Sequence, residues 1–298
     1  MSRLDPTSLK LFISVVEEKT IGAAAAREHI AAAAVSKRLS DIEQALGTPL
    51  LRRTNRGVEP TDAGLALLAL ARNALHELDQ IPAQMQSYSS GTRGLVRVCA
   101  SMSSITQFLP GDIQTFLTTH EGVQVNLDEK ISSLVIQSVQ ENAADIGIYT
   151  NVQDTKGLEI YPYRTDHLVL IMPKGHPLGT RKAWAFNDTL QHDYVGWQTG
   201  SAINQQLTNA AAAARQDWRL KIRVSSFDAL CMMVSSGLGV GVLPEAVARR
   251  NANNLNIEIR QLTDPWATRE FKICVRSISA LTTAAKMMVD HLTQIGSR

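Results

Sequence analysis

Cysteine is scarce in this chain, and the three cysteines present exclude a disulfide framework. Cys99, Cys231 and Cys274 are odd in number, lie far apart and include no CxxC pair. Small proteins that depend on disulfides carry many cysteines at close spacing. We therefore expect free thiols in a reducing cytoplasm. Redox sensing through Cys99 or Cys231 is an open alternative to simple burial in a strand or helix.

Long apolar runs are also missing. The N-terminus, MSRLDPTSLKLF, lacks the apolar core of a signal peptide, and the longest charge-free apolar stretch, Ala229 to Pro244, is rich in Gly and Ser. A bilayer span needs about 20 predominantly apolar residues. We expect a soluble, cytoplasmic protein that makes no contact with a membrane. Its 298 residues predict about two domains.

Sequence motifs for catalysis are absent. The chain has no GxSxG elbow, no HExxH and no His-x-x-x-His pair, and its seven histidines are dispersed. Gly237-Leu-Gly239-Val-Gly241 is similar to a dinucleotide loop, but Val242 replaces its last glycine and the segment lies inside an expected strand. We predict a protein that is not an enzyme and needs no metal or cofactor. An α/β enzyme and a solute-binding module without DNA function are the alternatives.

Positive charge is concentrated near the N-terminus. The net charge is only +2, but residues 27–56 hold six Lys or Arg against three Asp or Glu. Elsewhere, 24 basic residues face 25 acidic ones. Binding to duplex DNA needs positive charge gathered on one surface. This segment is therefore a candidate DNA reader, with an ordinary solvated surface as the alternative.

The segment from Thr20 to Gly47 predicts two helices joined by a tight turn. Thr20 is a candidate N-cap for an Ala-rich helix over 21–30, and a second helix is expected over 31–46. The second helix would bury one stripe, formed by Val35, Leu39, Ile42 and Leu46. Its opposite face is small and polar, and consists of Ala33, Ser36, Lys37, Ser40 and Gln44. Such a face suits a major groove, although an amphipathic helix pair in a core is the alternative.

A basic hairpin is expected directly after this helix pair. Arg52, Arg53 and Arg56 surround an Asn55-Arg56-Gly57 turn. Arginines at such a tip would meet phosphates, because the guanidinium combines a charge with a fixed fork of donors.

These pieces resemble the winged helix-turn-helix of the LysR-type transcriptional regulators over residues 9–64. The matching pieces are Leu9-x-x-Phe12-x-x-Val15, Ala24-Ala25, Val35-Ser36, Ile42-Glu43-x-x-Leu46-Gly47, Leu50-Leu51-x-Arg53, Arg56 and Thr61-x-Ala63-Gly64. The resemblance implies a double-stranded DNA partner, held by Ala32, Ala33, Ser36, Lys37, Arg38, Ser40, Arg52, Arg53 and Arg56.

Two departures from the family pattern affect how DNA would be read. The recognition helix opens with Ala31-Ala32-Ala33 where the family has polar residues, and Glu28 stands where leucine is usual. The first departure removes side chains that would cap the helix and read base edges. We therefore expect greater reliance on DNA shape and backbone contacts.

A long helix is expected from Asp62 to Ile81, which Pro82 should stop or kink, followed by a hinge over 84–94. One apolar stripe contains Leu68, Ala71, Leu75 and Leu78; a second beside it contains Leu67, Leu70, Ala74 and Ile81. A band this wide could cover the helix's own domain and also a second copy. The resemblance implies the dimerising linker helix, through Leu68, Ala71, Leu75 and Leu78. Burial in a single core is the alternative.

From residue 95 onward, expected strands alternate with helices, which predicts βαβ units arranged in two small lobes. Residues 93–298 resemble the effector domain of the same regulators, which has a periplasmic-binding-protein type II-like fold. The matching pieces are Phe108-Leu109-Pro110, Asp145-Ile146-Gly147-Ile148, His176-Pro177-Leu178 and Gly237-x-Gly239-x-Gly241-x-Leu243-Pro244.

The expected fold class is thus a two-part α+β and α/β chain. It comprises a winged helix-turn-helix (1–60), a linker helix and hinge (61–92), and a two-lobed α/β effector domain (93–298). Lobe 1 would hold 93–164 and 266–298, and lobe 2 would hold 165–265. A homodimer, and by family resemblance a homotetramer, is expected.

Candidate ligand contacts follow the expected strands, because sheets of this type bind ligands beyond their carboxyl ends. Ser101-Met-Ser103-Ser104 and Thr199-Gly200-Ser201 each open a helix, and the resemblance places an inducer pocket there. The predicted contacts are Ser101, Ser103, Ser104, Thr150, Thr199, Gly200, Ser201, Ser226 and Phe227. Helix capping is the alternative role for Ser103 and Ser201. No Arg or Lys occurs in these segments, so a monocarboxylate or a neutral aromatic is the expected effector.

Overall fold

The computed structural model describes residues 4–54, 57–90, 94–152 and 154–296, without the side chains of residues 53, 80 and 82–90. The chain divides into two compact units. The N-terminal unit holds Met1–Gly94 with Gln140–Ala144, and the C-terminal unit holds Leu95–Val139 with Asp145–Arg298.

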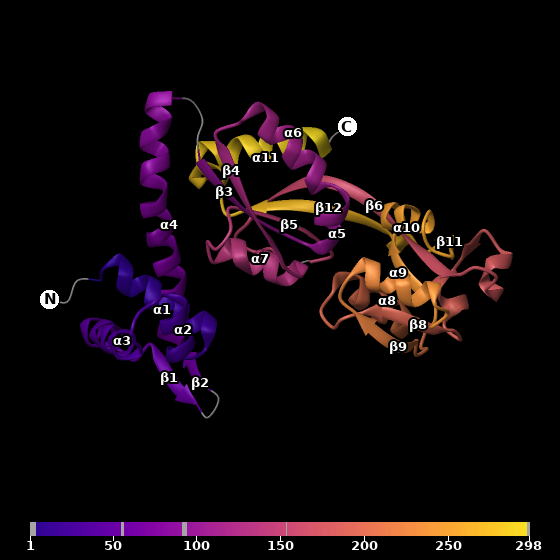
Figure 1. Ribbon diagram of the computed structural model, residues 1–298, viewed down its shortest axis with the longest axis horizontal. Coiled ribbons are helices and arrows are strands. Elements are labelled where there is room, and N and C mark those ends of the chain that lie inside the picture. Colours follow the sequence, from indigo (N-terminus) through magenta and orange to yellow (C-terminus); the bar gives the residue numbers. More distant parts are fainter. Residues whose placement is uncertain (1–3, 55–56, 91–93, 153, 297–298) are drawn as a thin grey trace. The chain divides into compact units, whose positions relative to one another are not determined.

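The N-terminal unit is a helical cluster with a hairpin and one long helix (Figure 1). Its elements are α1 (Pro6–Glu18), α2 (Ile21–Arg27), α3 (Ala32–Leu46), β1 (Leu51–Thr54), β2 (Gly57–Pro60) and α4 (Asp62–Ser90). Strands β1 and β2 pair antiparallel. The core is formed by apolar residues of α1, α2 and α3, closed by the first turns of α4.

Helix α4 continues past the point where the sequence predicted its end. It is helical from Asp62 to Ser90, so Pro82 lies inside it, and the expected hinge is helical up to Ser90. Proline removes one backbone donor, but its fixed φ is compatible with a helix. The helix therefore loses one hydrogen bond at Pro82 without ending there.

The C-terminal unit is built on an eight-stranded mixed sheet and a separate two-stranded sheet. Its strands are β3 (Gly94–Ala100), β4 (Val123–Glu129), β5 (Ile146–Thr150), β6 (Glu159–Pro173), β7 (Ala183–Trp184), β8 (Asp193–Trp197), β9 (Arg219–Val224), β10 (Gly241–Pro244), β11 (Ile257–Leu262) and β12 (Thr268–Val275). Its helices are α5 (Met102–Gln107), α6 (Leu109–Thr119), α7 (Ser132–Gln140), α8 (Ala202–Ala213), α9 (Phe227–Ser235), α10 (Glu245–Ala252) and α11 (Thr283–Gly296).

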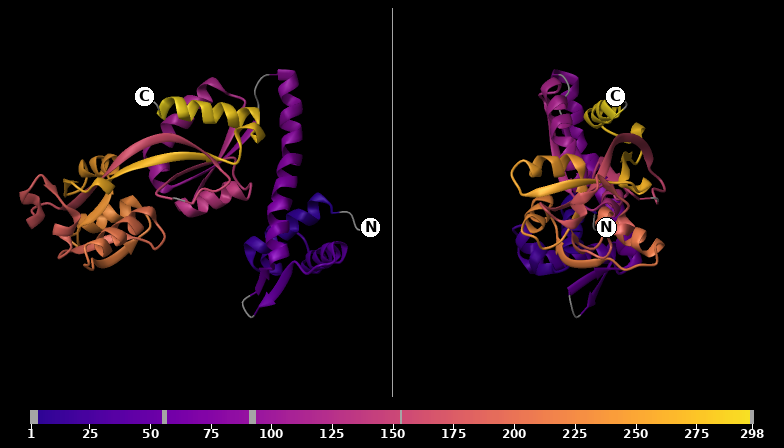
Figure 2. Two further views of the ribbon diagram at one scale, coloured as in Figure 1. Left: turned by 180° about the vertical axis from the view of Figure 1, so that it is seen from behind. Right: turned by 90° about the vertical axis from the view of Figure 1, so that its right-hand side faces the viewer.

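The long strands β6 and β12 run through the C-terminal unit and join its two halves, the lobes described below (Figure 2). The large sheet has the order β4-β3-β5-β12-β6-β11-β7, with β10 also on β6. The first half of β6 pairs with β12, and its second half pairs with β10 and β11. Parallel pairing joins β3 to β5 and β8 to β9, whereas all partners of β6 are antiparallel to it.

Two separate hydrophobic cores define two lobes. The core of lobe 1 uses residues between 96 and 163 and between 271 and 292. The core of lobe 2 uses residues between 168 and 267. Figure 1 shows α6 and α11 on one face of the lobe 1 sheet and α7 on the other. Among the described residues, only β6 and β12 pass directly between the two cores. These two strands therefore form the connection between the lobes.

Two short helices follow β3 in lobe 1. Helix α5 ends at Gln107 and α6 begins at Leu109. Pro110 lies in the first turn of α6, where its missing N–H has no helical partner to lose. Inside a continuous helix the same proline would have lost a hydrogen bond.

Candidate nucleic-acid interface and ligand cleft

The turn between α2 and α3 is held by local hydrogen bonds. Thr20 Oγ1 accepts a hydrogen bond from the Ala23 amide at 3.1 Å, which caps α2. Ala24 and Ala25 are buried, and their small side chains let α1 and α2 pack closely. His29 then adopts φ +55°, a left-handed conformation that turns the chain toward α3.

Glu28, the departure from the family pattern, is satisfied within this turn. Its carboxylate accepts a hydrogen bond from Ser14 Oγ at 2.6 Å and pairs with Lys10 Nζ at 2.8 Å. These two partners, Lys10 first, hold the pKa of Glu28 below its usual value. Polar contacts with Ser14 and Lys10 thus take the place of the apolar contact that leucine would make, and the Glu28 carboxylate is paired.

Helix α3 presents one face to the core and another to solvent. Val35, Leu39 and Ile42 are buried, as their spacing predicted, but Leu46 is 41% exposed because it lies at the last turn. The opposite face is open: Ala32, Ala33, Lys37, Ser40 and Gln44 are exposed, and Ser36 is half-buried. Ala31, at the N-cap position, provides no side-chain cap.

The cations near this face are accessible to a new partner. Lys37 forms no hydrogen bond or ion pair with another described residue. Arg38 pairs with Asp5 at 3.2 Å, and Arg52 with Glu59 at 3.0 Å, in ion pairs that are largely solvent-exposed. Exposed ion pairs contribute little energy, so phosphates can compete for these guanidinium groups. The Arg53 side chain and all of Arg56 lie outside the described residues.

The wing is anchored to the helices at its base. Glu43 Oε1 of α3 accepts hydrogen bonds from the Leu50 and Leu51 amides at 2.8 and 3.1 Å. The Val58 amide donates to the Lys19 carbonyl at the end of α1 (2.7 Å). Gly57 has φ +132°, and a Cβ there would lie 2.3 Å from the Lys19 oxygen, so only glycine fits. The hairpin therefore holds a fixed position relative to α3 within this unit.

The apolar residues that α4 exposes are not the ones predicted to form the dimer stripe. Leu68 and Ala71 are buried in the core of their own unit, and Leu75 packs against that core, because this face of α4 closes over α1. Leu78, the fourth predicted residue, is 45% exposed. The open apolar stripe is instead formed by Ala66, Leu70, Ala74, Leu78 and Ile81. We call this set the α4 stripe.

A small cavity of about 230 Å³ lies between the two lobes of the C-terminal unit. Five of the nine predicted contacts line it, namely Ser101, Ser103, Thr150, Ser201 and Phe227. They come from the ends of β3 and β5 in lobe 1 and from the starts of α8 and α9 in lobe 2.

The other four predicted contacts do not line this cavity. The Ser104 hydroxyl donates to the Ser101 carbonyl at 2.7 Å and is fully buried. Ser226 caps α9 by accepting from the Ala229 amide at 3.2 Å. Thr199 and Gly200 are exposed in the loop before α8. Hydroxyl groups at strand ends can serve the fold as well as a ligand, and the sequence does not distinguish these roles.

Several cavity-lining residues were not predicted from the sequence. Lys130 and Ser132 follow β4, whose carboxyl end reaches the same sheet edge, and Trp197 ends β8. The remaining residues are Met102, Glu129, Ile131, Gln198, Ala202 and Ile203. The position of Lys130 directly after a strand was the available signal, since it matches the rule applied to the other segments.

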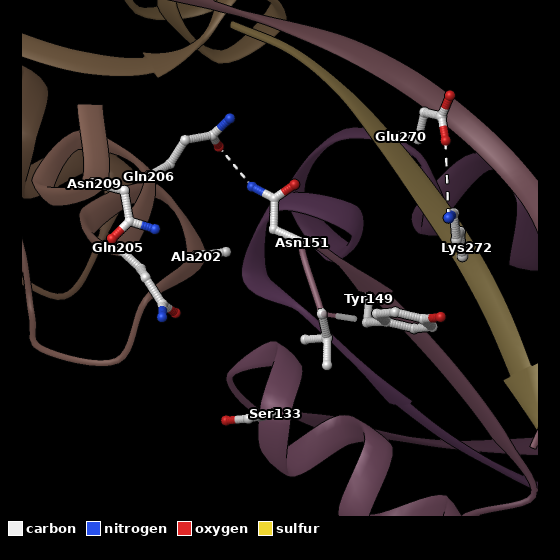
Figure 3. A pocket seen from close by; sticks show the side chains of 10 residues that line it. Ser133, Tyr149, Asn151, Ala202, Gln205, Gln206, Asn209, Glu270 and Lys272 are labelled. Atoms are coloured by element: carbon white, nitrogen blue, oxygen red, sulfur yellow. Dashed lines mark hydrogen bonds and ion pairs between the residues drawn. The ribbon is translucent and has the colours of Figure 1, made fainter. Parts of the chain in front are cut away.

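A larger cavity of about 710 Å³ lies beside the small one, and Ala202 lines both. Figure 3 shows its polar lining, which includes the carboxamides of Asn151, Gln205, Gln206 and Asn209. Asn151 Nδ2 of lobe 1 donates to Gln206 Oε1 of lobe 2 at 2.6 Å. This hydrogen bond joins the lobes across the cleft.

The cysteines have the properties of structural residues. All three are free and buried. Burial raises the pKa of Cys231 and of Cys274 to about 12, and it also raises the pKa of Cys99. The reactive thiolate is therefore scarce near neutral pH. Among the described residues, no cluster of three or more His, Cys, Asp or Glu could hold a metal, and no helix is both long and apolar enough to cross a bilayer.

Two family models match the chain over the two parts seen in the fold. Residues 6–65 match the bacterial regulatory helix-turn-helix protein, lysR family, and residues 89–296 match the LysR substrate binding domain. The chain belongs to the LysR family. It is a DNA-binding transcriptional regulator with an effector-binding domain, and this family is not one of enzymes.

Individual LysR-type relatives span nearly the whole chain. The uncharacterized HTH-type transcriptional regulator YbhD of Escherichia coli (strain K12) is 26% identical over 284 residues, which cover 94% of this chain and 88% of YbhD. Full-length CbnR complexed with its target DNA has a TM-score of 0.68 at 20% identity, covering 98% of this chain and 100% of CbnR.

The C-terminal part also has a liganded structural neighbour. The effector binding domain of QuiR in complex with shikimate has a TM-score of 0.61 at 17% identity, and the match covers 69% of this chain and 98% of that domain. At these identities, CbnR and QuiR establish the fold alone. They confirm the predicted fold class, a helix-turn-helix with a linker helix followed by a mixed α/β effector domain.

Proposed function

We propose that a small molecule bound in the small cavity controls how this LysR-type regulator, acting as a homodimer, binds duplex DNA. The observation that carries the proposal is a cavity lined from both lobes, next to the two strands that connect them. A ligand in this position contacts both lobes at once. It can therefore favour one arrangement of the lobes over another.

The DNA surface that we propose is the open face of α3 together with the wing. Ala32, Ala33, Ser36, Lys37 and Ser40 present short side chains and one unpaired ammonium. Alanine methyl groups can contact thymine methyl groups, while Ser36 and Lys37 can reach base edges or phosphates. Arg38, Arg52, Arg53 and Arg56 would meet phosphates, which position the protein without reading the sequence directly.

The partner of the α4 stripe, on this proposal, is the same stripe of a second copy. Its large residues, Leu70, Leu78 and Ile81, are 65%, 45% and 53% exposed. A helix face with this much apolar surface is stabilised by burial against another apolar surface. A two-fold dimer would bring two winged units to two half-sites, as duplex recognition by dimeric helix-turn-helix proteins requires.

Duplex binding and its control can be tested with the full-length protein. Fluorescence anisotropy with a pool of genomic fragments should show binding that weakens steeply with salt. A small-molecule screen should then identify a compound that raises the melting temperature and also changes the footprint on the selected fragment.

Variants test whether the compound that the screen identifies binds in the small cavity. Ser103→Ala combined with Ser201→Ala should abolish both responses to it, whereas Ser236→Ala, at an exposed serine of lobe 2, should retain them. A compound that changes the footprint equally in both variants would place the controlling site outside the cleft.

A further inference from the structure

The small cavity is rich in hydrogen-bond donors. Ser132 Oγ accepts a hydrogen bond from the Thr150 amide at 3.3 Å, and Ser201 Oγ accepts from the Asn204 amide at 3.1 Å. Because each hydroxyl oxygen is already an acceptor, each hydroxyl hydrogen is left to point elsewhere. The Ser103 hydroxyl lines the cavity and has no partner among the described residues.

Lys130 adds a positive charge to these donors. Its Nζ donates to the buried Ser138 hydroxyl at 2.9 Å, and Lys130 is one of the residues that line the cavity. An ammonium has three donors, so two remain. Lys130 forms no ion pair with a described carboxylate, although Glu129 also lines the cavity. Glu129 is exposed, so its charge is better screened by water than that of the half-buried Lys130.

The opposite wall of the cavity is apolar. Trp197 and Phe227 are buried in lobe 2 with ring centroids 4.9 Å apart. The Trp197 indole N–H donates to the Val242 carbonyl at 2.9 Å, so the indole has no donor left for a ligand. Ile203 continues this wall. A ligand would therefore meet polar donors from lobe 1 and from Ser201, and ring or aliphatic carbon from the rest of the lobe 2 wall.

We infer that the cavity selects small monocarboxylates with an apolar body, and that Lys130 is the residue that sets this selectivity. The inference rests on the proposed function, because it names the ligand class for the same cleft. The carboxylate accepts hydrogen bonds from Lys130, Ser103 and Ser132, and the apolar body lies against Trp197 and Phe227. Lys130 is the one cation among the residues that line the cavity, which matches a single carboxylate, and the volume of about 230 Å³ excludes large molecules.

Neutral analogues of the same shape should bind more weakly. A carboxamide replaces one acceptor oxygen with an NH₂ donor, which would face the donors of the cavity. Hydrogen bonds that involve a charged group are roughly twice as strong as neutral ones. Both effects favour the acid over its amide.

Matched acid and amide pairs test this inference on the full-length protein. The probes are butyrate and butyramide, cyclohexanecarboxylate and its amide, and benzoate and benzamide, each up to 50 mM at constant ionic strength. At least one acid should raise the melting temperature by about 2–4 °C, and its amide by clearly less. In Lys130→Met the apparent Kd of that acid should rise about tenfold or more, and the preference over the amide should disappear.

Three further variants control the experiment. Lys272→Met removes a lysine from the neighbouring large cavity and should leave the acid response intact. Lys130→Arg keeps a charge and should retain the preference for acids. If Lys130→Met does not fold, the double variant Ser103→Ala and Ser132→Ala removes two donors instead. It should weaken binding of the acid several-fold and binding of the amide less, because hydrogen bonds to a charged acceptor are the stronger ones.

Three results would overturn the inference. These are equal shifts for acids and amides, an acid response unchanged in Lys130→Met, and no response to any acid up to 50 mM. The last result counts because a cavity lined by Lys130 and by hydroxyl donors should hold even a simple carboxylate at that concentration. None of these results affects the proposed function, which is judged separately by the footprint and its response to the screened compound.

Discussion

Replacing Leu70 of the α4 stripe with Asp tests the proposed dimer directly. Leu70, Leu78 and Ile81 are each about half exposed in the single chain. Fully burying such a side chain contributes about 1.5–3 kcal/mol. Burying these three residues in both copies therefore contributes on the order of 6 kcal/mol to association. This gain is of the same order as the entropy lost when two molecules associate.

Leu70→Asp should remove a large part of that gain. Leu70 is the most exposed residue of the three, at 65%, and a two-fold dimer contains it twice. The loss of both leucines and the entry of two carboxylates should weaken the dimer by on the order of 3 kcal/mol, roughly a hundredfold in Kd. Sedimentation velocity across the micromolar range should show the wild type as a dimer or larger assembly and the variant shifted to monomer.

Leu65→Asp is the matched control. Leu65 is 53% exposed on the same helix, but it lies about 140° around the helix from Leu70. This variant should retain the wild-type assembly, and circular dichroism should show that both variants are folded. If Leu70→Asp sediments like the wild type, or if Leu65→Asp alone dissociates, the α4 stripe is not the dimer surface.

Other predictions concern the DNA-binding unit. Lys37→Ala should weaken duplex binding and lower the slope of log K against log salt by about one, whereas Lys182→Ala, at an exposed lysine of lobe 2, should change neither. Gly57→Ala should destabilise the unit by about 2 kcal/mol or more in urea unfolding, because its Cβ would overlap a carbonyl oxygen; Gly22→Ala, with no atom within 4 Å of its Cβ, should be nearly neutral. The pKa of Glu28 is lowered by folding, so its contribution to stability is complete above about pH 4.5 and is lost as the pH falls; unfolding curves of Glu28→Gln and wild type should differ at pH 7 and converge in acid.

The helical faces of the N-terminal unit were predictable because they depend on local spacing. The buried positions Val35, Leu39 and Ile42 follow from a 3.6-residue period, which needs no knowledge of the partner elements. The same 3.6-residue period did not reveal which apolar stripe of α4 packs into the core of the N-terminal unit. Both stripes are apolar, and only the position of α1 places Leu68 inside and leaves Leu70 outside.

The ligand cleft was predictable only in outline, because it is formed by loops that are distant in the sequence. The rule about strand ends selected Ser103 and Ser201, and both line the small cavity. Lys130 was missed because the segment after β4 was not included with the others. Without Lys130 no cation was expected in these segments, so a neutral aromatic remained an equal alternative to a monocarboxylate. In the structure Lys130 lines the cavity.

One side chain connects the small cavity to β6 and β12, the strands that join the lobes. Gln107, at the end of α5, donates through Nε2 to the Ser103 carbonyl at 3.0 Å and to Asp166 Oδ2 at 2.8 Å. Asp166 lies on β6 and forms a buried ion pair with Arg269 on β12, with 2.8 Å between Arg269 Nε and Asp166 Oδ1. Breaking a buried pair by removing one partner costs about 3–5 kcal/mol. The pair therefore holds β6 and β12 together where the chain passes between the lobes. On the proposed function, a ligand that shifts Ser103 would act on this fixed point through Gln107.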